Sequence, residues 1–143
     1  MFLGEYLHNV DDKNRLAIPV KFRHEFKNGM VLTRGLDSCL FLFTKSDWGT
    51  LVDKIKQLPL SQARARSFSR MMLMGAMEVK LDKLGRVLLP DYLKNYAGIS
   101  KKVVIGGVLN RLEIWDEGKW EQYKKESEKN VARTAEGMME LGI

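Results

Sequence analysis

The sequence has few of the residues on which catalytic and metal-binding sites are built. Its only cysteine, Cys39, has no partner for an intrachain disulfide, which indicates a reducing compartment, and its apolar neighbours favour a small core residue over a nucleophile. The two histidines, His8 and His24, do not have the spacing of metal ligands. Phosphate-binding glycine loops and the serine elbow of hydrolases are also missing. We therefore expect no enzyme, cofactor, metal or small-molecule substrate.

Long apolar runs are missing, and so are acidic residues in the middle of the chain. No apolar run approaches the roughly 20 residues that span a bilayer, and the start of the sequence has no secretory pattern, so no membrane association is expected. Between Lys54 and Met77 there are five basic residues and no acidic one. Residues 1–112 carry 19 basic and 10 acidic residues, and residues 113–143 carry 5 and 8. A basic body indicates a polyanionic partner such as nucleic acid, although a basic protein can also simply be soluble.

What the chain of 143 residues does contain is a repeated motif. Residues 10–19, VDDKNRLAIP, return as residues 81–90, LDKLGRVLLP, at an offset of 71. Each copy has an aspartate, a basic residue, an arginine four places after the aspartate, three apolar residues and a proline. A second match, LFLF at 40–43 with LEIW at 112–115, follows at an offset of 72. Two copies of this length indicate a duplicated domain whose halves share one core, because a single half is marginal in size.

Both copies predict the same order of elements: a strand, a charged turn, a short strand, a helix that begins at proline, a glycine stop and a pair of strands. The remaining segments favour helices, with Ser46 and Ser61 as expected N-caps, and Gly106-Gly107 is expected to form a turn. The predicted class is mainly β with added helices (α+β). The expected parts are a first half at 5–47, a helical connector at 48–75, a second half at 76–119 and a C-terminal helix at 120–143.

The two charged turns are the main candidate site. Asp11 and Asp82 are expected to shape the turns, because an aspartate carboxylate accepts backbone N–H groups two residues on. Asn14 and Gly85 suit the positive φ of such loops. The charged residues expected to point outward are Lys13, Arg15, Lys83 and Arg86. Paired arginines can bond bidentately to guanine or phosphate, so two such turns in a basic chain favour DNA binding over simple solvation.

At these motifs the chain resembles the MraZ family of bacterial transcriptional regulators, and the resemblance runs nearly end to end. The matching residues are Gly4, the turn at 11–15 with Pro19, the turn at 82–86 with Pro90, and the strand at 112–115. The resemblance implies two AbrB-like (SpoVT-AbrB) half-domains that interleave into one swapped-hairpin β-barrel with pseudo-twofold symmetry. It also implies ring-shaped homo-oligomers that bind short G-rich repeats in double-stranded DNA, upstream of their own operon in the division and cell-wall gene cluster.

The resemblance also implies roles for the turn residues. The family's Asp-x-x-x-Arg elements and their lysines fall on Asp11, Lys13 and Arg15, and on Asp82, Lys83 and Arg86. The arginines are expected to read bases or fix the register, and the lysines to hold phosphates together with Lys21 and Arg23. The predicted protein is a cytoplasmic, nucleoid-associated regulator, generally a repressor, whose subunit contacts come from the helix near 68–77 and from the tail. The alternative that stays open is an assembly module that grips an acidic protein.

Overall fold

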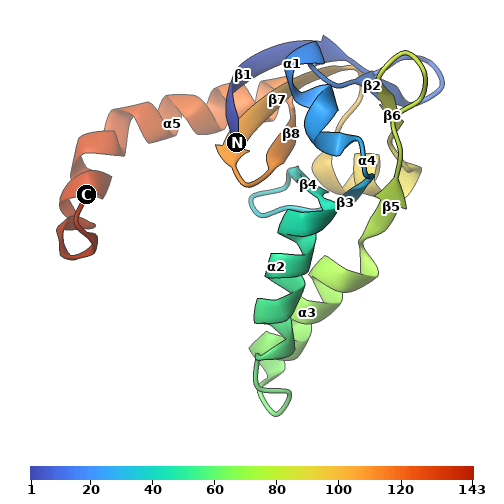
Figure 1. The fold of residues 1–143 in the computed structure, drawn as a ribbon. Coiled ribbons are helices and arrows are strands. Elements are labelled where there is room, and N and C mark those ends of the chain that lie inside the picture. The colour runs from blue at the N-terminus through green and yellow to red at the C-terminus, as the bar shows by residue number, and fades with distance from the viewer.

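The structure is a computed structural model of residues 1–143, with eight strands and five α-helices (Figure 1). The strands are β1 (Phe2–Asn9), β2 (Arg15–Ala17), β3 (Met30–Arg34), β4 (Leu40–Thr44), β5 (Met77–Val79), β6 (Arg86–Leu88), β7 (Lys102–Leu109) and β8 (Leu112–Asp116). The helices are α1 (Val20–Arg23), α2 (Lys45–Lys56), α3 (Ala63–Met74), α4 (Asp91–Ala97) and α5 (Glu117–Glu136), with short 3-10 turns at His24–Phe26 and Met139–Leu141. The predicted α+β class is confirmed. The α2–α3 hairpin and α5 project from the β body in different directions (Figure 1).

The two halves of the chain interleave in one six-stranded antiparallel sheet with the order β1-β7-β8-β4-β3-β5. β1 of the first half pairs with β7 of the second, from Phe2 opposite Leu109 to Asn9 opposite Lys102. In return, β5 of the second half pairs with β3 of the first. The order reads the same from both ends when each strand is exchanged for its counterpart, so a pseudo-twofold axis passes between β4 and β8. The sequence repeat is therefore a structural duplication.

A two-stranded sheet, formed by β2 and β6, carries the same symmetry through the repeated motifs. The central residues of the two strands lie opposite each other. Beside them, the N–H of Ile18 donates to the carbonyl of Gly85 at 2.9 Å. The symmetric bond runs from the N–H of Leu89 to the carbonyl of Asn14 at 2.8 Å. Each half thus closes the turn of the other half, and the two motifs are held side by side.

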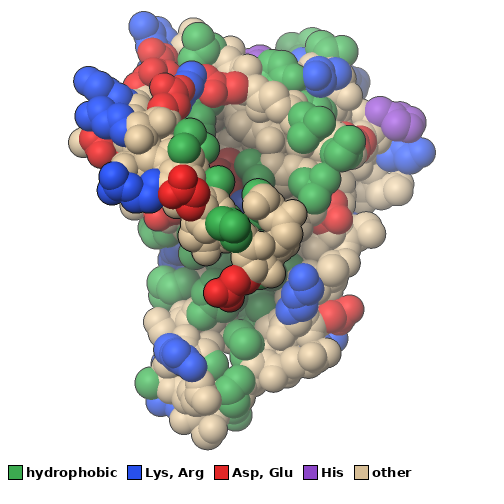
Figure 2. All heavy atoms as spheres, turned by 90° about the vertical axis from the view of Figure 1, so that its left-hand side faces the viewer, with side chains coloured by type: hydrophobic (Ala, Val, Ile, Leu, Met, Phe, Trp, Pro, Cys, Tyr) green, Lys and Arg blue, Asp and Glu red, His purple; other side chains and the backbone are tan.

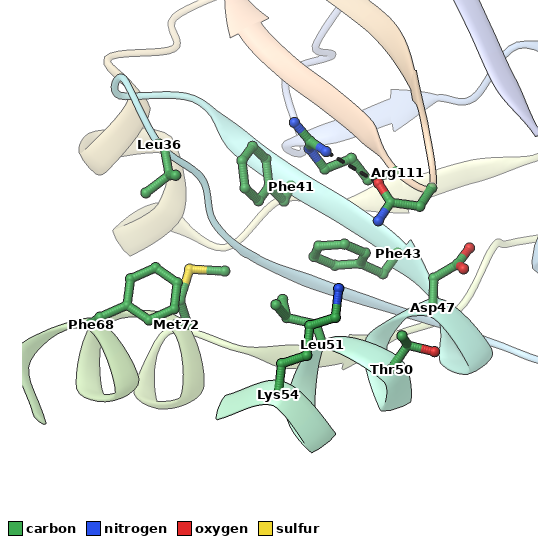
Figure 3. Close-up of a pocket in the computed structure, with 11 residues that line it drawn as sticks. Leu36, Phe41, Phe43, Asp47, Thr50, Leu51, Lys54, Phe68, Met72 and Arg111 are labelled. Carbon is green, nitrogen blue, oxygen red and sulfur yellow. Dashed lines mark hydrogen bonds between the residues drawn. The ribbon is translucent and has the colours of Figure 1, made fainter. Parts of the chain in front are cut away.

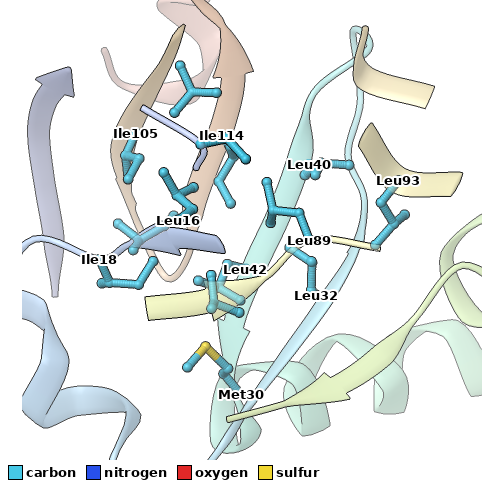
Figure 4. Packing of buried hydrophobic residues seen from close by; sticks show 14 of the residues in the cluster. Leu16, Ile18, Met30, Leu32, Leu40, Leu42, Leu89, Leu93, Ile105 and Ile114 are labelled. Atoms are coloured by element: carbon cyan, nitrogen blue, oxygen red, sulfur yellow. The ribbon is translucent and has the colours of Figure 1, made fainter. Parts of the chain in front are cut away.

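The main core draws on both halves and lies between the two sheets and the short helices α1 and α4 (Figure 4). It contains 19 buried residues. Leu16, Ile18 and Met30 of the first half meet Leu89 and Ile105 of the second, and all five are fully buried. Each such side chain contributes roughly 1.5–3 kcal/mol when removed from water. Because one cluster uses both halves, the chain forms a single folding unit.

A smaller cluster covers the opposite face of the six-stranded sheet. Phe41 and Phe43 reach it from β4, and they alternate with Leu40 and Leu42, which point into the main core, as the period of two in a strand requires. The seven buried members are Cys39, Phe41, Phe43, Ile55, Met72, Val104 and Trp115. Burial raises the pKa of the Cys39 thiol, so the predicted core role of this cysteine is confirmed.

The observed helix caps differ from the expected ones. α2 begins before Ser46, because the hydroxyl of Thr44 accepts a backbone N–H three residues on at 3.1 Å. α3 has no side-chain cap, so the prediction for Ser61 is also wrong. In the second half the carboxylate of Asp116, the counterpart of Thr44 in the repeat, caps α5 in the same way at 3.1 Å. Both long helices therefore start from the last residue of a strand.

The prediction of a turn at Gly106-Gly107 is wrong. Both glycines lie within β7, where Gly107 faces Gly4 of β1. A Cβ atom on Gly107 would collide with the backbone of Leu3, so the missing side chain lets β1 and β7 approach each other. Glycine in a strand marks close backbone approach as often as it marks a bend, and the residue pattern alone did not separate the two.

Candidate nucleic-acid interface

The first repeated motif folds into a turn that is held by its own aspartate. Oδ1 of Asp11 accepts the backbone N–H groups of Lys13 and Arg15, both at 2.9 Å. Oδ2 of Asp11 accepts Nε of the Arg15 side chain, also at 2.9 Å. Asn14 adopts the left-handed conformation with φ of 61°, which asparagine tolerates better than most residues. One carboxylate therefore fixes both the backbone of the turn and the direction of its arginine.

The second motif repeats this arrangement bond for bond. Oδ1 of Asp82 accepts the N–H groups of Leu84 and Arg86 at 2.9 Å, and Oδ2 accepts Nε of Arg86 at 2.8 Å. Gly85 takes the left-handed position with φ of 77°. The backbone N–H of each turn's arginine is the main cause that holds the pKa of the Asp11 and Asp82 carboxyls below the usual range. The loop-shaping residues predicted from the sequence occupy the expected positions.

The two turns lie beside each other across the pseudo-twofold axis. Nη1 of Arg86 lies 3.7 Å from Oδ2 of Asp11 on the other turn. The side chain of Arg15 is 32% exposed and that of Arg86 is 25% exposed. Their Nε atoms are bound to aspartates, so the edges left for a ligand carry the Nη atoms. A guanidinium fixed in this way keeps the planar fork that suits phosphate oxygens and guanine.

Each turn is also braced by the helix of the opposite half. The guanidinium of Arg23 on α1 fills the space beside Gly85, where any side chain would collide with it. At the symmetric place in the repeat, Lys94 of α4 donates to Oδ1 of Asn14 at 2.7 Å. The amide nitrogen of Asn14 in turn donates to Asp91 at 3.0 Å. The left-handed residue of each turn therefore also sets a contact between the halves.

The tips of the turns carry different side chains. The register of the Asp-held bonds makes Lys13 equivalent to Leu84 and Asp12 equivalent to Lys83. All four side chains are exposed, and Leu84 is 65% exposed. Neither lysine makes a hydrogen bond or ion pair within the chain. The two lysines thus point from non-equivalent positions of the two turns.

The remaining two predicted residues lie differently from the turn cations. Arg23 is half-buried, and its Nε donates to the carbonyl of Ile18 at 2.8 Å. Lys21 is exposed on the same helix, with its Nζ 5.2 Å from the ring centres of both Tyr6 and Phe22. The structure therefore places Arg23 against the second turn, whereas Lys21 lies over aromatic rings.

Lys94 and Leu84 were missed by sequence reasoning. The signal for Lys94 was present, because the offset of 71 relates it to Arg23. Around the turns the cations are Lys13, Arg15, Arg23, Lys83, Arg86 and Lys94, and the carboxylates are Asp11, Asp12, Asp82 and Asp91. The local net charge is therefore +2, and the lysines that carry it outward have no internal partner.

A cavity of about 240 Å³ lies elsewhere, between α2, α3 and β4 (Figure 3). Phe41 and Phe43 line it together with Met72 of α3. The guanidinium of Arg111 lies 4.6 Å from the ring centre of Phe41, and its Nη1 donates to Asn110 at 3.1 Å. The lining contains no nucleophile beside a base, which makes this cavity a gap in the packing of the α2–α3 hairpin.

Two further classes of site were searched for across the whole chain. No group of three or more histidine, cysteine, aspartate or glutamate side chains is placed to hold a metal ion. None of the helices combines the length and the apolar surface that crossing a bilayer takes. The twin turns remain the candidate site.

The fold and the paired turns define a duplicated, interleaved β protein of the AbrB-like class. The family described as "MraZ protein, putative antitoxin-like" matches the chain twice, at residues 1–71 and 72–141. The chain belongs to the MraZ family, so the resemblance seen in the motifs is confirmed. The boundary between the two matches agrees with the offset of the repeat.

Curated relatives cover the chain completely. Three of them carry the name "Transcriptional regulator MraZ" and align over 143 residues, which is 100% of both chains. The protein of Natranaerobius thermophilus is 46% identical, that of Caldicellulosiruptor bescii 48% and that of Clostridium beijerinckii 50%. The chain is therefore a transcription regulator of this family, whose name describes regulation and not catalysis.

Proposed function

We propose that this regulator binds DNA sequence-specifically through its twin turns. The observation that carries the proposal is the placement of two Asp-held arginine turns side by side, with free lysines at their tips. The Nη edges of Arg15 and Arg86 read guanine or fix the register on phosphates. Lys13 and Lys83 hold phosphates, with Arg23 and Lys21 as further contacts. Each bidentate contact to a base is worth about 1–3 kcal/mol of discrimination.

The proposed target is a set of tandem G-rich repeats upstream of the chain's own operon, in the division and cell-wall gene cluster. One pair of turns covers little DNA, so a single chain has few contacts with which to bind tightly. A ring-like homo-oligomer in the cytoplasm, associated with the nucleoid, engages several repeats at once and gains affinity through effective concentration. Its action there is generally repression.

The test compares turn variants on DNA from upstream of the chain's own coding region and on a scrambled duplex of the same composition. Lys13→Ala and Lys83→Ala remove no internal bond, so their folding is unaffected. Arg15→Ala and Arg86→Ala remove the base readers. Arg64→Ala, an exposed α3 cation outside the turns, is the matched control.

We expect Arg15→Ala and Arg86→Ala to lose the preference for the upstream DNA, and each lysine variant to lower the salt slope of binding by about 0.9. Thermal melts check that the arginine variants still fold. Full affinity and preference in both arginine variants would refute the assignment of the turns. A wild-type protein that binds neither duplex, but binds an acidic protein, would favour the assembly module instead.

A further inference from the structure

The tail helix α5 has no partner within its own chain. It is 20 residues long and none of its residues is buried. Only its first turns touch the body, where Trp120 and Tyr123 pack with Trp115 at ring-centre distances of 5.3 and 5.0 Å. The apolar side chains beyond them are exposed: Val131, Met138, Met139, Leu141 and Ile143. Since an isolated helix of this length is marginal in water, most of its stability has to come from packing.

The α2–α3 hairpin carries an open apolar groove. A hollow of about 390 Å³ lies between the two helices. Its apolar lining comprises Val52, Ile55, Leu58, Leu60, Ala65 and Leu73. Lys56, Arg66 and Arg70 stand at its edges, and Leu60 is 80% exposed. Figure 2 shows hydrophobic side chains gathered over this lower part of the molecule, while charged side chains crowd the upper part.

The charges of the two elements are complementary. Residues 54–77 carry five basic and no acidic residues. Residues 126–143 carry four acidic and two basic residues. Glu128 lies one turn before Val131, and Glu140 lies between two exposed apolar residues, so acids flank the apolar edge of the tail. The groove has the reverse pattern, an apolar floor with cations at its rim.

The tail and the groove of one chain cannot meet, because α5 and the hairpin extend from the body in different directions and their ends lie far apart (Figure 1). We propose that the apolar edge of α5, with its 3-10 turn at Met139–Leu141, seats in the α2–α3 groove of a second copy of this chain. Such a contact joins two different surfaces, so it repeats from copy to copy and closes a ring or extends as a filament. The inference rests on the proposed homo-oligomer and not on DNA binding.

The test uses charge reversal at both surfaces, read out as particle mass by light scattering and sedimentation. The groove variant is Lys56→Glu with Arg70→Glu, and Arg66 is kept because it bonds the carbonyl of Leu60 at 3.1 Å. The tail variant is Glu128→Lys with Glu140→Lys. Matched controls are Arg64→Glu on the same helix α3 but outside the groove lining, and Glu121→Lys about two turns nearer the body.

We expect the wild type and both controls to be oligomers and each double variant to fall to the 16.5 kDa of one chain. An equal mixture of the two double variants then regains the oligomeric mass, because each reversed tail meets a reversed groove and each native tail a native groove. A chain with all four substitutions regains it too. Circular dichroism checks that the monomeric variants stay folded.

Other results overturn the inference in distinguishable ways. If the double variants keep the wild-type mass, or if neither the mixture nor the fourfold variant restores it, the tail does not seat in the groove and the oligomer of the proposed function still stands. If the wild type itself runs as a single chain, both this contact and the proposed oligomer fall, while the DNA assay remains an independent test of the turns.

Discussion

The two turns have the same internal bonds and different tips. In both, an aspartate holds the backbone and the side chain of its arginine, with bonds of 2.9 and 2.9 Å in the first turn and 2.9 and 2.8 Å in the second. Their tips present Lys13 in one case and Leu84 in the other. The bonds that define the turn are thus the same in both halves, whereas the side chain offered to a partner has diverged. A duplicated scaffold can therefore carry two surfaces with different chemistry.

The largest expected effect tests whether the two halves are energetically equivalent. Ile18→Ala and Leu89→Ala remove symmetric side chains, both fully buried in the shared core. Each should lower the free energy of unfolding by about 2–5 kcal/mol, and each should leave a single cooperative transition in urea. Val20→Ala, at a side chain that is 74% exposed, should stay within about 0.5 kcal/mol of the wild type. Two separate transitions would contradict a single folding unit.

A smaller effect distinguishes the left-handed residues. Gly85→Ala forces a Cβ into a φ of 77° and displaces Arg23, so it should cost about 1–2 kcal/mol. Asn14→Gly loses two side-chain hydrogen bonds to α4 but relieves the backbone, so it should cost less than about 1 kcal/mol. Thermal denaturation of both variants measures the difference. Equal losses would mean that the bracing from the opposite half does not matter.

An exchange of tips sharpens the comparison on DNA. Lys13→Leu gives the first turn the tip of the second, and Leu84→Lys does the reverse. If a lysine at this position reaches a phosphate, the salt slope of binding should fall by about 0.9 in the first variant and rise by about as much in the second. Binding measured from about 50 to 200 mM salt tests this. A slope unchanged in both would indicate that neither tip touches the backbone.

The smallest expected effect concerns pH. The pKa values of the Asp11 and Asp82 carboxyls are lower in the folded chain than their ordinary value of 3.8. The ionised turns therefore stabilise the fold above that value, and this contribution disappears as the pH falls through the lowered pKa. Asp11→Asn and Asp82→Asn should lose stability at pH 6 but differ little from the wild type near pH 2. Asp12→Asn, whose side chain makes no hydrogen bond, should lose little at either pH.

The residues allowed the local structure of the site to be predicted. The repeat located both turns, and the preferences of Asp11, Asn14 and Gly85 gave their shape. Sequence could not give the partners of the strands, because an offset of 71 says that the halves are alike and not whether a strand pairs within its own half. The bond from Lys94 to Asn14 is lost to prediction for the same reason, since it joins residues 80 positions apart.

The helices were harder to predict because their packing decides their fate. α2 ends before Pro59 and α3 folds back, so that Met72 reaches the smaller core cluster. The counterpart of this proline in the second half is Val131, and α5 continues straight through it. The helix-forming pattern of the tail was visible, but its lack of internal cover was not.

The pairing of β1 with β7 sets the order of events during synthesis. Phe2 lies opposite Leu109, so the first strand leaves the ribosome long before its neighbour exists. At about 5–20 residues per second, more than a hundred further residues take roughly 5–20 seconds to emerge. During that delay the edges of β1 and β3 stand open, and a nascent first half can pair with the same half of another polypeptide. Covalent fusion counters this, because it delivers the correct strand to each edge at high local concentration.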